Sequence, residues 1–539
     1  MSGARSLRAA SWPFPAAAGV LLAILAAYLW GAVRQNAGHF VFAQDDPYIH
    51  LSIARTLATN GVWGLTAEHF APASSSPLWT LLLAGLIRLG GASAMWPLGI
   101  NVAAGLLVLW VFDRLLRFHA PPALRFGALV AAMVVLPVPT LVFIGMEHTL
   151  HVAVVLAFCG AAAHKLSRDD DRDGLWIPGL MLAAVTSGLR YEGLFVVAAV
   201  LVGFALRRHW TTAVSLGFAG AIGPVAYAIF AVAQGALPLP NSVLMKSDPA
   251  RFASASSVLS VAGDWVGLLT LHRRPVFAAL TVGTLLLAAV IATPRTRGRT
   301  PAMVLGALFL GVEVLHVCLV KIEWFYRYEA YVVGLGLAAV FMAACEAAAT
   351  TAWRDMVSAS PLRRRAIGAC VVVLALPLVS RAAEAILLTV PATGEVYKQQ
   401  YQMGVFFRDH YAGDVIALND IGAVSWLAPV EIVDLIGLAS SDVADARRRN
   451  ADDTALYAHV LQRHHAVAAC VYEYYFSGSR ALPASWHRVG EWDMGHHAAV
   501  SGERVTFYAP PGHEARLARA LDDFAPRLPS GVEYRPQQR

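Results

Sequence analysis

Two adjacent carboxylates follow the first long apolar stretch of the chain. Asp45 and Asp46 lie in the segment FAQDDPYIHLSIARTLATNG, residues 42–61. Pro47 suits the first position of a helix and Asp46 suits its N-cap, so the bland alternative is that the pair only starts a helix. One cap needs one carboxylate, however. We therefore expect Asp45 to be a general base that takes a proton from a hydroxyl group, with Asp46 beside it.

Ionisable residues recur at the ends of later apolar runs, in four short segments. These are FIGMEH at 143–148, GLRYEG at 188–193, PNSVLMK at 240–246 and WFYRYEA at 324–330. The basic residues among them, which are candidate partners of a phosphate, are Arg190, Lys246 and Arg327. The residues expected to line a substrate site are Tyr48, Glu147, His148, Glu192, Tyr326 and Glu329. Two alternatives stay open: plain ion pairs for the charged residues, and an interfacial belt for the aromatic ones.

This set of groups suits one type of reaction. A carboxylate offers a base for an acceptor hydroxyl, Arg offers a planar fork for a phosphate, and Lys offers a point charge. An apolar bundle beside them would hold a lipid tail. The combination fits glycosyl transfer from a lipid-linked sugar phosphate, in which the cations stabilise the departing lipid phosphate. No cofactor is required by the sequence, and a divalent metal (Mg²⁺, Mn²⁺ or Ca²⁺) shared by an acid and the phosphate is an open hypothesis.

The composition places these residues in a membrane protein. The chain has 539 residues, is 57% hydrophobic and only 14% charged, and has a mean hydropathy of +0.55. Soluble domains carry about 25% charged residues, and repeated apolar runs of about 18 or more indicate membrane spans. Half of the 36 acidic residues lie after Pro391. We therefore divide the chain into a transmembrane catalytic part, 1–390, and a soluble tail, 391–539.

A short apolar segment at 77–91 decides the topology. It has about 15 residues, which is short for a span, so we expect it to lie at the membrane surface. The clusters of Arg and Lys between spans then all fall on the cytoplasmic side, as topology signals do, so the net charge of +6 does not indicate nucleic acid. The first outer loop, 34–94, and the tail fall outside. About eleven spans are expected, at 16–33, 95–116, 125–144, 147–164, 175–189, 191–206, 211–233, 276–293, 302–320, 330–349 and 366–389.

The tail combines strand and helix patterns. The apolar runs GDVIALNDIGAVSWL, VEIVDLIGLA, HAVAACVYEYY and RVTFYAP predict strands, and ADARRRNADDTALYAHVLQRH predicts one polar-faced helix. A tail of about 150 residues can bury its own core. We expect an α/β domain that recognises the acceptor or acts as a lid.

The segments, in this order, resemble the GT-C fold glycosyltransferases that use polyprenyl-phosphate sugars, and most of all the arabinofuranosyltransferases of the bacterial cell envelope. The pieces that carry the resemblance are DDPYIHLSIARTLATNGVWGL, SSSPLWTLLLAGLIRLGG, IGMEHTLHVAVVLA, GLRYEGLF, LPNSVLMKS, FYRYEAYVV and NDIGAVSWL. The resemblance implies a multi-span helical bundle with a juxtamembrane helix at 77–91 and an extracytoplasmic α/β domain, in the bacterial inner membrane.

The same resemblance implies a chemistry. Asp45, with Asp46, would be the catalytic acid of the first outer loop, and the donor would be a polyprenyl-phosphate pentose or hexose whose sugar carbon inverts on transfer. The other expected partners are the lipid bilayer and an acceptor, which is a glycan, a lipid or a protein. The residues identify neither the sugar nor the acceptor.

Two other classes of protein stay open. A transporter or lipid flippase has ionisable residues in mid-span, lining a path, and Glu313 and His316 are placed in this way. A non-enzymatic envelope-assembly protein would use the tail as its binding module.

Overall fold

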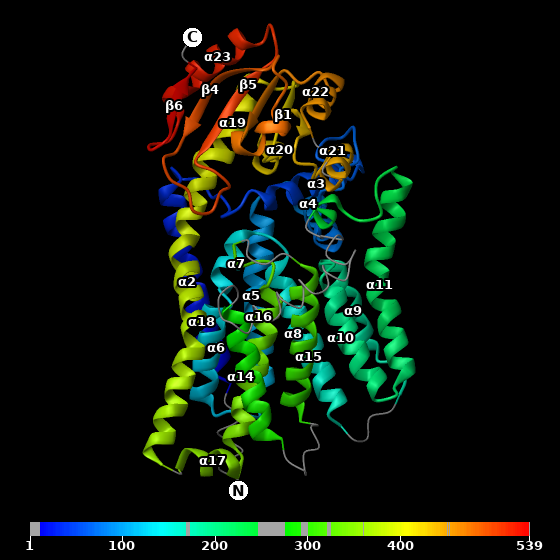
Figure 1. Cartoon of the computed structure of the whole chain (residues 1–539), viewed down its shortest axis with the longest axis vertical. Coiled ribbons are helices and arrows are strands. Elements are labelled where there is room, and N and C mark those ends of the chain that lie inside the picture. Colours follow the sequence, from blue (N-terminus) through cyan, green and yellow to red (C-terminus); the bar gives the residue numbers. More distant parts are fainter. Residues whose placement is uncertain are drawn as a thin grey trace.

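The molecule is a bundle of long helices with a small β-sheet domain stacked on one end (Figure 1). This computed structural model describes residues 11–168, 173–245, 275–292, 300–320, 325–358, 360–449, 451 and 453–537. The short helix α17 (Thr351–Ser358) lies at the end of the bundle opposite the sheet domain. The expected architecture, a multi-span helical part followed by an α/β tail, is confirmed.

Long apolar helices form the bundle, as the hydropathy of the sequence predicts. Within the described residues, seven helices are long and apolar enough to cross a membrane, and the bent pair α6–α7 makes an eighth. The seven are α2 (Pro13–Gln35), α5 (Met95–Leu116), α8 (His148–Leu166), α11 (Trp210–Ala233), α15 (Pro301–Leu319), α16 (Ala330–Ala348) and the helix that begins with α18 (Pro361–Val396). The chain is therefore a multi-pass membrane protein.

The bent pair consists of α6 (Pro122–Val135) and α7 (Val138–Ile144), which meet at 41°. Pro137 and Pro139 lie at the break, where proline removes backbone donors that a continuous helix needs.

Three further apolar helices lie where the sequence predicts spans, but they are shorter. α9 (Ile177–Leu189), α10 (Gly193–Leu206) and α14 (Pro275–Ile291) have 13, 14 and 17 residues. A helix the length of α9 rises only ~20 Å, against a hydrocarbon core of about 30 Å. Each of the predicted spans thus corresponds to a helix or to the bent pair, and the number that cross the membrane stays a prediction.

Two helices between α2 and α5 lie where the bundle meets the sheet domain (Figure 1). α3 (Asp46–Asn60) ends at Gly61, whose φ of 74° is left-handed and suits glycine. α4 (Pro77–Gly90) buries Trp79 and exposes Leu89. This two-sided apolar helix agrees with the juxtamembrane helix expected at this position.

The start of α3 differs from the expectation. Asp45, not Asp46, is the N-cap residue, and its side chain makes no capping hydrogen bond to α3. The prediction that Asp46 caps this helix is therefore wrong. Both carboxylates have partners elsewhere, because other elements approach this end of α3.

The last span continues into the sheet domain. α18 is followed directly by a π-helical turn, Tyr397–Tyr401, and by α19 (Gln402–His410). The predicted boundary at 390/391 lies inside α18, so the division into two domains stays a prediction. The sheet domain is joined to the bundle by continuous helix rather than by a flexible linker.

The sheet of the tail mixes parallel and antiparallel pairs. Its six strands in the described residues are β1 (Val415–Leu418), β2 (Glu431–Asp434), β3 (Ala468–Val471), β4 (His487–Asp493), β5 (Arg504–Ala509) and β6 (Glu533–Pro536). Their order is β2-β1-β3-β5-β4-β6, with β2, β1 and β3 parallel and the other pairs antiparallel. Each of the four predicted runs contains a strand, but the prediction for 413–427 is wrong after β1, because Gly422–Leu427 is the helix α20. β4 and β6 were not predicted.

The helix predicted at 444–464 is two helices. α21 (Ser441–Arg448) and α22 (Thr454–Arg463) are separate because Asp453 begins the second, its side chain accepting a hydrogen bond from the Leu456 N–H at 2.9 Å. The remaining helices are α12 (Asn241–Leu244), α20 (Gly422–Leu427) and α23 (Glu514–Phe524).

Candidate active site

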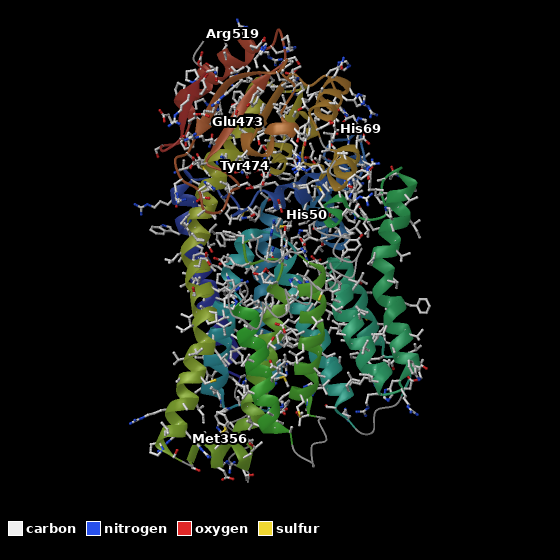
Figure 2. The ribbon with its side chains drawn as sticks, viewed as in Figure 1. His50, His69, Met356, Glu473, Tyr474 and Arg519 are labelled. Atoms are coloured by element: carbon white, nitrogen blue, oxygen red, sulfur yellow. The ribbon has the colours of Figure 1, made fainter. Side chains whose placement is uncertain are left out.

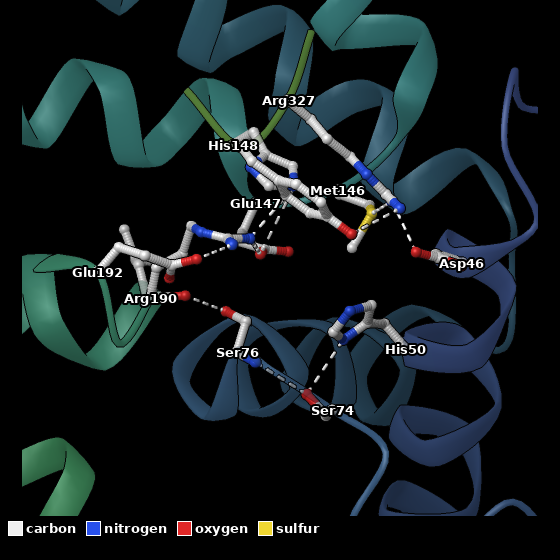
Figure 3. Close-up of polar contacts among 12 residues, drawn as sticks. Asp46, His50, Ser74, Ser76, Met146, Glu147, His148, Arg190, Glu192 and Arg327 are labelled. Atoms are coloured by element: carbon white, nitrogen blue, oxygen red, sulfur yellow. Dashed lines mark hydrogen bonds and ion pairs between the residues drawn. The ribbon is translucent and has the colours of Figure 1, made fainter. Parts of the chain in front are cut away.

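The site begins with an ion pair between the start of α3 and the segment before α16. Arg327 Nη1 lies 2.7 Å from Asp46 Oδ2 (Figure 3). Only 2% of the Arg327 side chain is exposed, whereas 34% of the Asp46 side chain is exposed. Met146 Sδ, 2.9 Å from Arg327 Nη1, and the ring of Tyr328, centred 5.0 Å from Arg327 Cζ, hold the guanidinium from other sides. Asp46 is therefore a solvent-accessible carboxylate fixed against a buried cation.

A second buried guanidinium lies nearby. Arg190 Nη1 lies 2.5 Å from Glu147 Oε1 and 3.2 Å from His148 Nε2, and its Nη2 lies 2.6 Å from Glu192 Oε1 (Figure 3). The ring of Tyr328 is centred 6.0 Å from Arg190 Cζ. Because the same ring contacts the first guanidinium, the two ion-pair clusters adjoin each other.

The structure therefore brings together residues that are far apart in the sequence. Those predicted from the sequence are Asp46, Glu147, His148, Arg190, Glu192 and Arg327. Sequence reasoning missed His50, which faces this cluster in Figure 3 and contacts Ser74 Oγ at 3.1 Å and Thr80 Oγ1 at 3.3 Å. The sequence does contain a signal for His50, because it lies four residues after Asp46, and this spacing puts both side chains on one face of α3.

Both guanidiniums retain a buried donor. The Nε atoms of Arg190 and Arg327, and Oε2 of Glu147, have no hydrogen-bond partner among the described residues. A buried polar group left in this way costs about 1–3 kcal/mol. A bound polar ligand would satisfy these atoms.

The remaining predicted residues lie elsewhere. Tyr48 is buried beside Phe42, whose N–H donates to the phenol oxygen at 3.3 Å, so Tyr48 belongs to the core and not to a substrate surface. Glu329 Oε1 lies 2.6 Å from Arg381 Nη1, and the ring of Tyr326 is centred 4.9 Å from Arg381 Cζ. Lys246 lies outside the described residues.

Arg381 was not foreseen because it lies in a long apolar run of α18, 366–389, with Glu384 as its one charged neighbour there. With Tyr326 and Glu329 it lines a separate cavity of about 390 Å³, which also contains Phe325 and Ala498. The alternative of plain ion pairs among neighbouring charged residues does not hold for Arg327 and Glu329, which pair with Asp46 and Arg381 from other parts of the chain.

An apolar cavity of about 540 Å³ opens beside the Arg190 cluster. Its lining comes from α3, α4, α9 and α11 and includes Leu57, Leu78, Gly188, Tyr227 and Phe230. Gly188 is two residues before Arg190, and Ser76 Oγ donates to the Leu189 carbonyl at 2.5 Å, which joins the start of α4 to the end of α9. The cavity lining therefore includes the end of α9, one turn from Arg190, and none of the charged residues of the cluster.

The carboxylates of the site are already paired with cations. Asp46, Glu147 and Glu192 each have one oxygen on a guanidinium. Across the part of the chain that the structure describes, no three His, Cys, Asp or Glu side chains gather closely enough to hold an ion. The divalent metal stays a hypothesis, and the reaction proposed below contains no step through it.

The ionisable residues in mid-span are paired within the bundle. Glu313 Oε2 accepts a hydrogen bond from Thr281 Oγ1 at 2.5 Å, and His316 Nδ1 lies 2.9 Å from the Tyr331 hydroxyl oxygen. These contacts join α14, α15 and α16 to one another, which gives both residues a structural role.

Asp45 contacts the sheet domain instead of the cluster. Its Oδ2 and Oδ1 accept hydrogen bonds from the N–H groups of Gly422 and Ala423, each at 2.7 Å, at the start of α20. At the other end of α20, Arg55 donates to the carbonyls of Ser425 and Trp426 at 2.8 and 2.9 Å. The acid meets the positive end of α20 and the base meets its negative end, as helix dipoles favour. We call this arrangement the α3–α20 clamp.

The clamp needs glycine at position 422. A Cβ added to Gly422 would lie 2.2 Å from the Asp45 carbonyl oxygen and 2.7 Å from its Oδ2. We expect Gly422→Ala to lower stability by about 1–3 kcal/mol, because the backbone must shift to relieve the overlap. Thermal unfolding checks this, with Gly368→Ala as the control, since nothing lies within 4 Å of that position. Equal melting temperatures for the two variants would contradict the close approach.

The clamp also predicts a pH dependence. Burial, followed by the charge of Asp420, raises the pKa of Asp45 from 3.8 to about 8, although the Gly422 and Ala423 N–H groups act in the opposite direction. Between these values the folded chain holds a proton that the unfolded chain has lost, so stability falls as pH rises towards 8 and then levels off. We expect Asp420→Asn to end this fall at a lower pH, measured by thermal unfolding from about pH 5 to 9. An unchanged profile would show that the two carboxyls do not interact.

Part of the tail matches a protein family, and most of the chain is similar to distantly related solved structures. Residues 393–508 match the family "Domain of unknown function (DUF8728)". No curated protein matches. Among solved structures, the chain is similar to ArnT from Cupriavidus metallidurans bound to undecaprenyl phosphate, with 14% identity over 92% of this chain and 99% of that one, at a TM-score of 0.48.

It is also similar to the Archaeoglobus fulgidus oligosaccharyltransferase in complex with Zn and sulfate, with 11% identity over 94% of this chain and 77% of that one, at a TM-score of 0.45. Such distant likenesses assign no residue roles, which rest on the contacts above.

Proposed function

We propose that this protein is a membrane glycosyltransferase that moves a sugar from a polyprenyl-phosphate donor to a hydroxyl of a cell-envelope acceptor. The observation that carries the proposal is the ion pair of Asp46 with Arg327, a reachable base fixed beside a buried cation. The apolar cavity whose lining includes Gly188, two residues before Arg190, supplies a place for the lipid. The GT-C resemblance of the sequence supports the same reaction.

Asp46 is the base in this proposal, and Asp45 is a positioning residue. Both oxygens of Asp45 already accept backbone hydrogen bonds from α20, so neither is open towards an acceptor hydroxyl. Asp46 has an oxygen on Arg327 and an exposed surface. The acceptor O–H proton passes to Asp46, and the freed oxygen bonds to the anomeric carbon.

The leaving group departs towards the cations. As the new bond forms, the bond from the anomeric carbon to the phosphate oxygen breaks, and its electron pair remains on the polyprenyl phosphate. A single displacement of this type inverts the sugar carbon. The Nε–H groups of Arg327 and Arg190 are buried donors for the phosphate oxygens, and they stabilise the charge that develops there. Lys246 belongs to the same proposal through the sequence pattern alone.

Glu147, His148 and Glu192 orient Arg190 rather than touch the sugar. Two carboxylates hold the planar fork in one position, so the cation is arranged before the donor arrives. The topology from the Arg and Lys clusters puts this site on the outer side of the bacterial inner membrane. Polyprenyl-phosphate arabinofuranose is one of the polyprenyl-phosphate sugars that this proposal includes as donors.

The test is incubation of the full chain in nanodiscs with a panel of polyprenyl-phosphate pentoses and hexoses. Release of polyprenyl phosphate that requires an added acceptor is the expected result. A protein that moves the lipids between leaflets but cleaves none of them would be a transporter, and the proposal would be wrong.

A further inference from the structure

A cavity of about 330 Å³ lies between the bundle and the sheet domain, apart from the apolar cavity. Its wall on the bundle side is Phe325. The sheet domain supplies the rest of the lining, which is Tyr474, Tyr475, His497, Ala498, Ala499, Val500 and Ser501. The cavity is therefore formed only when the two parts of the molecule are together.

Both walls of this interface cavity are tied to the Asp46–Arg327 pair. Phe325 is two residues before Arg327 in the chain. On the other wall, the Ala499 carbonyl accepts a hydrogen bond from Gln44 Nε2 at 3.5 Å, and Gln44 is two residues before Asp46. The segments that carry Asp46 and Arg327 therefore both reach the walls of the interface cavity.

Tyr474 presents an aromatic face at this interface. It is 55% exposed, which makes it unusual among the large apolar side chains of the sheet domain. Its hydroxyl donates to the Ser501 carbonyl at 2.8 Å, and its ring centre lies 4.3 Å from that of Tyr475. Figure 2 shows Tyr474 at the end of the sheet domain nearest the bundle, with His50 below it. The ring is held in place without being buried.

The facing loop is also held in place. The Glu395 carboxylate accepts hydrogen bonds from the N–H groups of Ala498, Ala499 and Val500 at 2.9, 2.7 and 3.2 Å. Glu395 lies in α18, so the loop that lines the cavity is fixed to the continuous helix. The cavity is thus largely preformed, as binding sites usually are.

We propose that the interface cavity binds the neutral sugar at the end of the acceptor and presents its hydroxyl to Asp46. The electron-rich face of a tyrosine attracts the weakly positive C–H groups on the apolar face of a sugar ring. The side chains of His497 and Ser501 lie in the same lining and can bond to its hydroxyls. The described lining contains no Lys or Arg, so it suits a neutral sugar better than a phosphorylated one. This inference rests on the proposed function and names its acceptor class.

The test measures binding without transfer. Full-length protein in nanodiscs, prepared without sugar detergents, is titrated with methyl glycosides of mannose, galactose, glucose and arabinose, followed by saturation-transfer NMR. At least one glycoside should bind. Tyr474→Ala should weaken its binding by about 10-fold or more, while Tyr474→Phe, which keeps the ring, should bind like wild type. Normal binding by Tyr474→Ala, or no glycoside bound by wild type, would overturn the inference.

Further arms separate the possible failures. Octyl glycosides of the same sugars, inserted in the nanodisc, test for an acceptor that is carried on a lipid. If methyl and octyl glycosides both bind, the site recognises the end of a glycan without its carrier. Either result supports the inference. Tyr474-dependent binding with no release of polyprenyl phosphate from any donor would defeat the proposed reaction and leave the sugar site standing. If transfer occurs, Tyr474→Ala should raise the acceptor KM and leave the donor KM unchanged.

Discussion

Asp46→Asn is expected to lower the rate of polyprenyl-phosphate release by roughly 10²–10⁴-fold, the usual contribution of a general base. Asparagine keeps the shape of the side chain and a contact to Arg327 but cannot take the acceptor proton. The 34% exposure of the Asp46 side chain means that its replacement should disturb the fold little. Radiolabelled donor turnover, measured beside thermal unfolding of the same samples, checks the prediction.

Glu68→Gln is the matched control, because Glu68 is an exposed acid of the loop that joins α3 to α4. It should retain wild-type turnover. Asp45→Asn provides a second comparison: it weakens the α3–α20 clamp, so it should lower the melting temperature along with turnover. If Asp46→Asn remained active while Asp45→Asn was inactive at full stability, the roles assigned to the two acids would be reversed.

The clamp explains why the sheet domain matters to a site made mostly by the bundle. α3 carries Asp46 at its first position, and the next residue towards the N-terminus is fixed to α20. Ser425 Oγ adds a contact to Ser52 Oγ at 2.9 Å. Rotation of α3 would move Asp46 away from Arg327, so the clamp sets the geometry of the proposed base.

The general form of the fold followed from the sequence because long apolar runs and charge clusters act locally. The errors of the prediction also have local causes. β6 escaped prediction because its residues are mostly exposed and polar, and the helix predicted at 444–464 is divided by the cap that Asp453 provides. The continuous helix across Pro391 was not expected, since proline inside a helix usually marks an end or a kink.

Within the site, the spacing of residues along α3 predicts which side chains share a face of this helix. His50, four residues after Asp46, shares its face, while Tyr48, two residues after it, points to the core. The partners of Asp45 and Glu329 could not be foreseen in the same way. Gly422 is 377 residues from Asp45, and Arg381 is 52 residues from Glu329. No local pattern in the sequence specifies such contacts.

Arg190→Ala is the substitution expected to destabilise the protein most, by about 3–5 kcal/mol. Glu147 has no exposed surface, and Arg190 is its charged partner at 2.5 Å. Removing the guanidinium leaves a buried carboxylate without a counter-ion and frees His148 and Glu192 from their fixed positions. The melting temperature should fall, and donor turnover should fall further than the loss of folded protein explains.

The double variant Glu147→Gln with Arg190→Ala separates the two effects. Because it removes the unpaired carboxylate as well, it should recover part of the stability lost in Arg190→Ala, while turnover stays low if Arg190 stabilises the departing phosphate. Arg190→Lys should keep more stability but little activity, since an ammonium group cannot contact both carboxylates as a planar fork does. Recovery of full turnover in the double variant would remove Arg190 from the donor site and leave it a structural ion pair.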